Sequence, residues 1–369
     1  MSLLDEINRK ATELGIPLSV HLDITWRCNE RCVHCYLDHD GKDEMTTVEI
    51  KEALRQVKEC GAFFLSISGG EPLLRRDCFE ILEYARALRM NVKLKTNAVM
   101  IGPEEAARVR KLGIEQVQIS VYSHIAEVHD AITKLPGSFR RTMEAIQLLK
   151  ENGVKVSITN VVMMHNTGHG KAVKQLADEL GVAFSIDPSI TPKLNGDWSI
   201  VSLGISPNEL EQIYRMEEFV GNVGEFCSPV STVDEDVLEG YGCSAGHSLA
   251  YISPAGDVFP CVQLPLLCGN LRKQTFSEIW KHSSALAELR SVRVRNLPIC
   301  SHCNHIAYCS RCPGLAYMEG DLRGPSSLDC GKSYARTGIP ASVQSEAGDR
   351  AACDTRGLVQ VAEAPSATA

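Results

Sequence analysis

"LSVHLDITWRCNERCVHC", residues 18–35, is an apolar run that leads directly into three closely spaced cysteines. The run is rich in Leu, Val and Ile and predicts a β-strand. Cys28, Cys32 and Cys35 follow at the end of that strand, where parallel α/β sheets place their active sites. The stretch therefore predicts an α/β fold with three thiols at the mouth of its sheet.

Strands and helices alternate from this stretch to about residue 190. Further strands are predicted at residues 63–68, 92–96, 115–123, 154–164 and 182–188. The helices between them begin with the capping boxes Thr46-x-x-Glu49 and Asp77-x-x-Glu80 and continue near residues 103–112, 139–152 and 170–181. Repeated βα units imply a parallel sheet covered by helices, doubly wound or barrel-like, and six strands are too few for a closed eight-stranded barrel.

The remaining segments are less regular. Residues 1–17 predict a short helix before the sheet region of residues 18–190. Residues 191–242 predict a bridge with one helix, "SPNELEQIYRMEEFV", opened by Ser206. In residues 243–332, "LAYISPAGDVFPC" predicts a hairpin and "FSEIWKHSSALAELRSV" a helix. Residues 333–369, rich in Ala, Ser and Gly, predict a disordered tail.

Composition and charge exclude several classes of protein. The apolar fraction of 44% and the charged fraction of 23% are those of an ordinary globular protein. No apolar run approaches the ~20 residues that span a bilayer, and the N-terminus mixes both charge signs, unlike a signal peptide. We therefore expect a cytoplasmic protein with no membrane partner. The net charge of −8 and the scattered Lys and Arg residues argue against nucleic-acid binding.

Fifteen cysteines are too many for a cytoplasmic protein unless most of them do chemistry, because disulfides are rare where thiols stay reduced. Ten of them form two groups. The first is Cys28, Cys32 and Cys35, and the second is Cys243, Cys261, Cys300, Cys303, Cys309, Cys312 and Cys330. The others are predicted to be inert buried thiols: Cys60, Cys78, Cys227, Cys268 and Cys353.

The spacing of the first group leaves more than one kind of site open. Three thiolates suit an iron-sulfur cubane with one open iron. They also suit a zinc ion that keeps one position for water, His34 or His39. From the spacing alone, zinc and an inert thiol cluster both remain alternatives.

A second motif follows the second predicted strand, in "SISGGEPLLRRD", residues 66–77. Gly69 and Gly70 permit the close approach of a ligand, and Glu71 offers an acceptor for an ammonium group. A tight turn between strand and helix would explain the glycines, but it does not need the glutamate.

In combination, Cys28-x3-Cys32-x2-Cys35 and Gly69-Gly70-Glu71-Pro72 make the chain resemble the radical S-adenosylmethionine (radical SAM) enzymes. The resemblance implies a partial (β/α)6 TIM-like barrel whose three cysteines hold a 4Fe-4S cluster. The fourth iron would take the amino and carboxylate groups of S-adenosylmethionine, and Glu71 would accept a hydrogen bond from that amino group. Reduction would then cleave this cofactor to a 5'-deoxyadenosyl radical.

The same resemblance assigns cofactor contacts residue by residue. They are His34, Gly69, Gly70, Glu71, Pro72, Thr96, Asn97, Ser120, Asn160 and Val162. The chain departs from the family at Ala98, where many relatives have glycine, and at Tyr122 and Ser123, which replace the common Asp-Gly. For the contacts after the third, fourth and fifth strands, an ordinary polar residue at a strand end is the alternative.

The second cysteine group resembles the SPASM extension of radical SAM enzymes, a small cysteine-rich domain with a β-hairpin and a helix. By this resemblance, one auxiliary 4Fe-4S cluster is held by Cys300, Cys303, Cys309 and Cys330. Another is held by Cys243, Cys261 and Cys312, with Cys227, Cys268 or an open iron as the fourth position. The gap in Cys309-x2-Cys312 is one residue shorter than in the family, and a zinc module is the alternative.

The two resemblances cover roughly residues 18–332 and imply a peptide maturase of the PqqA-peptide-cyclase and mycofactocin-maturase type. Such an enzyme crosslinks or oxidises a side chain of a ribosomally synthesised peptide. The expected partners are the precursor peptide, an electron donor such as flavodoxin or ferredoxin, and a separate peptide-recognition protein. The alternatives are a sulfatase-maturing or tetrapyrrole-modifying enzyme of the same family, and a non-catalytic zinc or iron-sulfur scaffold.

Overall fold

The computed structural model describes residues 3–39, 43–227, 235–344 and 350–352. A largely parallel sheet is the main feature of the first part of the chain. Its strand order is β6-β5-β4-β3-β2-β1-β7-β8-β9. The first six strands are β1 (Ser19–Asp23), β2 (Phe64–Ser68), β3 (Asn91–Thr96), β4 (Gln116–Ser120), β5 (Val156–Val161) and β6 (Ala183–Asp187). Each pairs in parallel with the next one along the chain, which confirms the predicted parallel sheet.

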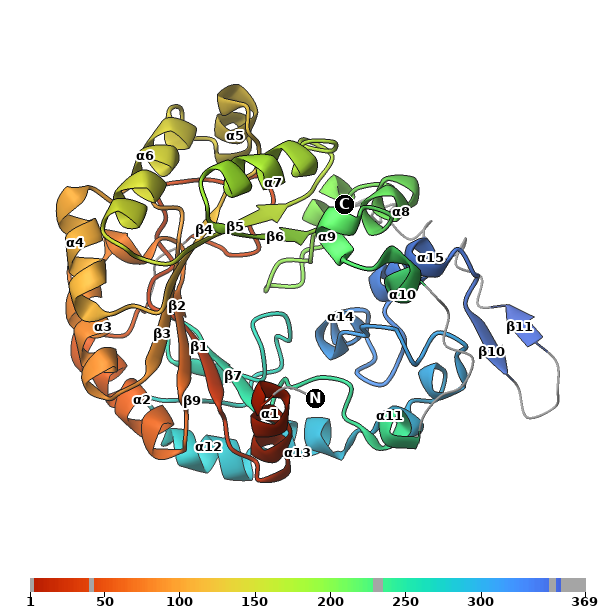
Figure 1. Ribbon diagram of the computed structural model, residues 1–369. Coiled ribbons are helices and arrows are strands. Elements are labelled where there is room, and N and C mark those ends of the chain that lie inside the picture. The colour runs from red at the N-terminus through yellow and green to blue at the C-terminus, as the bar shows by residue number, and fades with distance from the viewer. Residues whose placement is uncertain (1–2, 40–42, 228–234, 345–349, 353–369) are drawn as a thin grey trace, which may run out of the picture. The chain divides into compact units, whose positions relative to one another are not determined.

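Helices connect these strands, and α2, α3, α4 and α6 lie along one face of the sheet (Figure 1). The helices of this region are α1 (Leu3–Glu13), α2 (Thr47–Glu59), α3 (Cys78–Ala87), α4 (Pro103–Leu112), α5 (Ala126–Thr133), α6 (Ser138–Glu151) and α7 (Gly170–Glu179). Parallel strands require such crossovers, and the partial (β/α)6 barrel is confirmed. None of the helices in the described ranges is both long and apolar enough to cross a bilayer.

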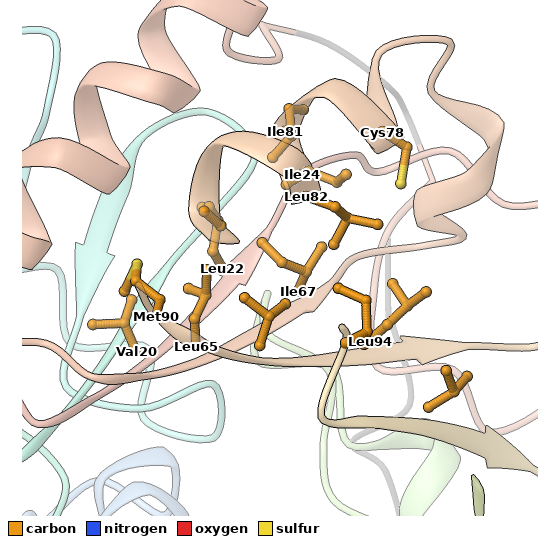
Figure 2. Packing of buried hydrophobic residues seen from close by; sticks show 14 of the residues in the cluster. Val20, Leu22, Ile24, Leu65, Ile67, Cys78, Ile81, Leu82, Met90 and Leu94 are labelled. Carbon is orange, nitrogen blue, oxygen red and sulfur yellow. The ribbon is translucent and has the colours of Figure 1, made fainter. Parts of the chain in front are cut away.

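The main apolar core lies between the sheet and these helices. Leu22, Ile67 and Leu94 come from three adjacent strands and share one cluster with Ile81 and Leu82 of α3 (Figure 2). All five side chains are at most 1% exposed. Burial alternates along β3 and most of β2, since successive side chains point to opposite faces. The face turned away from the helices is therefore left for polar side chains.

The hairpin predicted in residues 249–261 is present and extends the same sheet. β7 (Leu249–Ile252) pairs in parallel with β1, and β8 (Asp257–Phe259) and β9 (Gly269–Asn270) follow in antiparallel order. Gly256 allows the hairpin turn, because its φ of +83° lies in the left-handed region. The hairpin thus continues the sheet beyond β1.

The chain divides into two compact units whose limits differ from the predicted boundaries. One unit contains Met1–Gly204 and Ser244–Ala287, and the other contains Ile205–Cys243 and Glu288–Ala369. The stretch from 244 to 287 joins the sheet unit because β7 takes the free edge of β1 and α12 (Phe276–His282) follows the hairpin. Sequence alone indicated the hairpin but not the strand with which it would pair.

The second unit consists mainly of short helices. They are α8 (Pro207–Tyr214), α9 (Glu217–Val220), α10 (Val223–Cys227), α11 (Glu235–Glu239), α14 (Pro313–Met318) and α15 (Ser327–Thr337), and α13 (Ser284–Ser291) leads into the unit. Ser206 caps α8 as predicted, but that helix stops at Tyr214. The predicted tail at 333–369 begins inside α15, and its residues 345–349 and 353–369 lie outside the described residues.

Asp77 does not cap α3 with its side chain, contrary to the prediction. Its carboxylate accepts hydrogen bonds from Arg75 Nε (2.9 Å), Arg75 Nη2 (2.6 Å) and Thr47 Oγ1 (2.6 Å). The buried Arg75 also donates to the carbonyls of Ile24 and Met45, each at 2.9 Å. An arginine has enough donors for all these partners, so it connects both ends of the first cysteine segment to the start of α3.

We expect Asp77→Asn to destabilise the fold at neutral pH and to lose this effect in acid. The Arg75 guanidinium lowers the pKa of Asp77 to about 2, below the value of about 3.9 for an unfolded chain. A depressed carboxyl pKa stabilises the fold above pH ~4, and this contribution is lost as the pH falls toward about 2. Urea unfolding of the metal-free protein should show a loss of about 1–3 kcal/mol at pH 7 that shrinks below pH ~4.

Asp178→Asn is the matched control, because Asp178 is an exposed helix residue paired with Lys174 one turn away. Its effect on the free energy of unfolding should stay within about 0.5 kcal/mol. If Asp77→Asn caused the same loss at pH 7 and at pH 3, the proposed ionic contribution of Asp77 would be wrong.

Candidate functional site

The turn after β2 is hydrogen-bonded to the segment that carries the first cysteines. The backbone N–H of Gly70 donates to the Thr25 carbonyl, and that of Glu71 donates to the Arg27 carbonyl, each at 2.8 Å. A Cβ on Gly69, whose φ is +141°, would lie 2.5 Å from the Thr25 carbonyl oxygen. A Cβ on Gly70 would overlap the Arg27 carbonyl. Both glycines are therefore required where the two segments meet.

Glu71 is fully buried, and the chain itself occupies both of its carboxylate oxygens. Oε1 accepts from the backbone N–H of Leu73 (3.0 Å), and Oε2 accepts from that of Asn97 (2.8 Å). Thr96 Oγ1 lies 2.8 and 2.9 Å from the two oxygens. Burial raises the pKa of Glu71, and these hydrogen bonds oppose that rise. The carboxylate thus connects the end of β2, where Pro72 begins a short turn, to the end of β3.

The three thiols of the first group lie half-buried in one loop with polar neighbours. Cys28 Sγ accepts from the backbone N–H of Glu30 at 3.4 Å. Cys32 Sγ lies 3.3 Å from Glu30 Oε2 and 3.9 Å from the Tyr122 hydroxyl, which donates to it. Cys35 interacts electrostatically with both other thiols. The structure therefore brings the predicted ligands together, with Glu30 and Tyr122 as neighbours that the sequence did not indicate.

Burial controls the protonation of these cysteines. It raises the pKa of Cys28 to about 12 and raises the pKa of Cys32 and Cys35 as well. Without a cation the three groups are neutral thiols, and a bound metal would have to displace their protons. Arg31 lowers the pKa of Cys35 but does not outweigh burial, and a bound cluster would supply further positive charge.

The geometry among the described residues shows no group of three His, Cys, Asp or Glu side chains placed to hold a single metal ion. A four-iron cluster does not need such a group, because each thiolate binds a different iron. His39, the alternative zinc ligand, has its Nδ1 3.1 Å from the Trp26 carbonyl oxygen. The three half-buried thiols are therefore compatible with a 4Fe-4S cluster.

Two predicted cofactor contacts have buried polar atoms without a hydrogen-bond partner. These atoms are His34 Nδ1 and Asn160 Oδ1. The amide nitrogen of Asn160 donates to the Val121 carbonyl at 2.7 Å, which fixes the side chain at the end of β5. Buried polar atoms are nearly always paired, so both atoms are suited to meet a polar ligand.

The other predicted contacts have roles within the chain. Thr96 and Asn97 donate to Glu71. Ser120 interacts with the Tyr122 hydroxyl. The backbone N–H of Val162 donates to the Asp187 carbonyl at 2.8 Å, and its side chain is buried. These contacts suit the strand-end roles that the sequence left open, and the part of these residues in cofactor binding stays a prediction.

Tyr122 occupies a position where the sequence departs from its family. Its backbone N–H donates to His129 Nδ1 (3.3 Å), and its carbonyl accepts from the Asn166 amide (2.7 Å). Its ring packs edge-on against His34 at 4.9 Å between centroids. These contacts direct the hydroxyl toward Cys32. The sequence singled out Tyr122 because it departs from the family pattern. The contact of its hydroxyl with Cys32 is seen only in the structure.

Four cysteines of the second group line one cavity in the second unit. They are Cys300, Cys303, Cys309 and Cys330. They are the same four that the SPASM resemblance assigns to one auxiliary cluster. Burial raises the pKa of Cys300 to about 11 and also raises that of Cys309, while Arg311 lowers the pKa of Cys300. Four thiols around one cavity, of which Cys300 is buried and the others are half-buried, are a suitable donor set for a 4Fe-4S cluster.

Cys312 does not line that cavity. It interacts electrostatically with Cys243, and its backbone N–H donates to Asp329 Oδ2 at 2.7 Å. Although only two residues lie between Cys309 and Cys312, the first of these cysteines lines the cavity and the second does not. Cys261, the third residue predicted for the other auxiliary cluster, belongs to the first unit.

The remaining cysteines have various surroundings. Cys227 Sγ lies 3.4 Å from the Tyr214 carbonyl oxygen, and Cys268 Sγ lies 3.3 Å from that of Leu266. Cys78 is part of the main core, and Cys60 packs against it. Cys353 lies outside the described residues.

Comparisons with known proteins agree with this arrangement. Residues 22–177 match the radical SAM superfamily, and residues 243–304 match the SPASM iron-sulfur cluster-binding domain. The chain is 31% identical to the AdoMet-dependent heme synthase of Methanosarcina barkeri, over 82% of this chain and 92% of that protein. It is 30% identical to mycofactocin maturase MftC of Mycobacterium ulcerans and 29% identical to the PqqA peptide cyclase of Xanthomonas campestris, each over 90% of this chain and 91% of the relative.

The fold is also shared with a solved structure, Streptococcus suis SuiB bound to its precursor peptide SuiA. The TM-score is 0.70 at 18% sequence identity, and the match covers 88% of this chain and 78% of SuiB. At this identity the likeness concerns the fold alone.

We expect Glu71→Gln to lower the free energy of unfolding by about 1–3 kcal/mol. Both carboxylate oxygens accept a backbone N–H, so the amide would place an NH2 group against a donor in either orientation. The measurement is urea unfolding of the metal-free protein. Glu52→Gln is the control, because Glu52 is exposed on α2. Equal stability of wild type and Glu71→Gln would show that the connection between the two strand ends is unimportant.

Proposed function

The chain belongs to the radical SAM superfamily and carries an SPASM iron-sulfur cluster-binding domain, and we propose that it modifies a side chain of a ribosomally synthesised peptide. The modification would be a crosslink or an oxidation. The observation that carries the proposal is the near end-to-end similarity to a protein named peptide cyclase and to one named maturase. The fold shared with SuiB, which was solved with a precursor peptide, supports it.

Within this proposal, Cys28, Cys32 and Cys35 hold a 4Fe-4S cluster. The bound cluster and S-adenosylmethionine supply the reductive cleavage of a sulfonium, after which a hydrogen atom can be taken from the substrate. The glycine turn after β2 brings backbone to within reach of the cofactor without side chains in between, and Glu71 fixes that turn. His34 and Asn160 offer their unpaired polar atoms to the cofactor.

A second cluster is proposed on the four cysteines that line the cavity of the second unit. A third cluster on Cys243, Cys261 and Cys312 remains a prediction. We also propose two partners: flavodoxin or ferredoxin as the electron donor, and a separate peptide-recognition protein. Both remain predictions. Auxiliary clusters would take up the electron left after a hydrogen atom is removed, or would bind the peptide.

A second candidate function has its own observation in its favour. The similarity to an AdoMet-dependent heme synthase, 31% identical over 82% of this chain, supports modification of a tetrapyrrole side chain. Both reactions use the same fold, because function depends on the site and not on the fold. The substrate therefore has to be decided by experiment.

The test is anaerobic incubation of the reconstituted protein with S-adenosylmethionine, a reductant and one candidate substrate. The candidates are a short peptide encoded beside the gene and an iron tetrapyrrole with propionate side chains. We expect 5'-deoxyadenosine and a changed mass of the peptide, measured by mass spectrometry. Deoxyadenosine that accumulates while the peptide keeps its mass and the tetrapyrrole loses mass would refute peptide modification in favour of the alternative.

Cys32→Ala serves as the negative control in the same assay. Since Cys32 is a proposed cluster ligand, this variant should form no deoxyadenosine with any substrate. Activity that survives in Cys32→Ala would refute the assignment of the first cluster. A non-catalytic scaffold, in contrast, predicts no deoxyadenosine from the wild-type protein and a low iron content.

The iron content tests the cavity of the second unit. Cys330→Ala removes one of the four lining cysteines and should lower the iron content by about four per chain, one 4Fe-4S cluster. Cys60→Ala is the matched control, because Cys60 packs against the main core and should leave the iron content unchanged. An unchanged iron content in Cys330→Ala, measured by colorimetric assay, would exclude a cluster at this cavity.

A further inference from the structure

His305 is a buried histidine whose ring has no hydrogen-bond partner. It is 1% exposed, and neither Nδ1 nor Nε2 has a partner at hydrogen-bond geometry, although the Ile339 carbonyl lies near the ring. It lies in the loop between Cys303 and Cys309 and lines the same cavity as the four cysteines of the second unit. An unpaired polar ring thus faces the place where four thiols meet.

An unpaired imidazole in this position has to be explained. Every protonation state of the ring carries at least one N–H group. Burying such a donor without a partner costs roughly 1–3 kcal/mol, so buried polar groups are nearly always paired. The backbone N–H of His305 already donates to Cys303 Sγ at 3.4 Å. It is therefore the ring, and not the backbone, that needs an acceptor.

The other polar side chains around the cavity are already engaged by the chain. The Arg311 guanidinium donates to the carbonyls of Leu322 and Gly324. Asp329 accepts from the backbone N–H of Cys312 (2.7 Å) and from Lys332 Nζ (3.1 Å). Arg311 also interacts with Cys300, and Ser333 interacts with Cys309. Among the residues that line the cavity, the His305 ring is the buried polar group whose atoms have no hydrogen-bond partner.

We propose that a ring N–H of His305 donates a hydrogen bond to a sulfur atom of the iron-sulfur cluster held by Cys300, Cys303, Cys309 and Cys330. This inference rests on the cluster assignment in the proposed function. Hydrogen bonds to cluster sulfurs help to set the reduction potential, because they stabilise the more negative, reduced state. His305 is thus a positioning residue that makes this cluster easier to reduce.

The test compares His305→Phe, which keeps an aromatic ring without a donor, with His305→Gln, which keeps an N–H group. Midpoint potentials are measured on the reconstituted full-length protein by redox titration followed by electron paramagnetic resonance. Repeating the titration in a Cys28/Cys32/Cys35→Ala background removes the signal of the first cluster. We expect His305→Phe to lower the reduction equilibrium constant about tenfold, a shift of ~59 mV for one electron, and His305→Gln to restore part of it.

His302→Gln is the matched control, because His302 is an exposed histidine directly before Cys303 and does not line the cavity. It should leave the potential unchanged. An unchanged potential in His305→Phe would overturn the proposal and would indicate another acceptor, such as the nearby Ile339 carbonyl. Equal shifts in the Phe and Gln variants would also overturn it, since they would indicate a role in packing alone.

Pulsed electron paramagnetic resonance with ¹⁵N-labelled histidine supplies an independent readout. A weak nitrogen coupling that disappears in His305→Phe supports a hydrogen bond. A strong coupling, typical of an iron-bound imidazole, would show that His305 is a ligand and would overturn the proposal. If the Cys28/Cys32/Cys35→Ala protein with an unchanged His305 gave no cluster signal at all, the cluster assignment itself would be refuted. That failure would be seen before any His305 variant is made.

Discussion

The hydrogen bonds from Gly70 and Glu71 to the carbonyls of Thr25 and Arg27 are the contact on which the candidate site depends. They exist because β1 and β2 are parallel neighbours whose carboxyl ends meet at one edge of the sheet. Two glycines allow the backbones to approach closely, and the buried Glu71 carboxylate then connects β2 to β3. Two motifs that are far apart in sequence become one site through main-chain contacts.

Desolvation that outweighs the nearby arginine charges is the common property of both cysteine groups. In the first group and in the cavity of the second unit, desolvation raises the thiol pKa values, so the chain by itself favours neutral thiols. A bound cluster supplies further positive charge, and its sulfurs supply acceptors for buried donors. By the same argument, the unpaired ring of His305 would donate to a cluster sulfur. Without such an acceptor, the buried ring would lower the stability of the fold.

Family membership leaves the substrate open for a physical reason. The sheet and its helices position the cysteines, the glycine turn and the strand ends. The relatives named heme synthase and peptide cyclase are both similar to most of the chain, so they share this framework. Substrate choice depends on side chains that differ between relatives. Tyr122, which replaces a common acidic residue and contacts Cys32, shows that such differences reach the centre of the site.

The sequence by itself determined the order of strands and helices, the two cysteine groups and the glycine turn, because hydrophobic periodicity and capping are local properties. The tertiary structure decided what depends on competition for distant partners. Asp77 binds Arg75 instead of capping α3, β7 joins β1, and the Glu71 oxygens are taken by residues at the end of β3. It also decided that Cys309, and not Cys312, faces the cavity with His305. Burial and pairing are set by residues far away in the chain, so spacing alone does not reveal them.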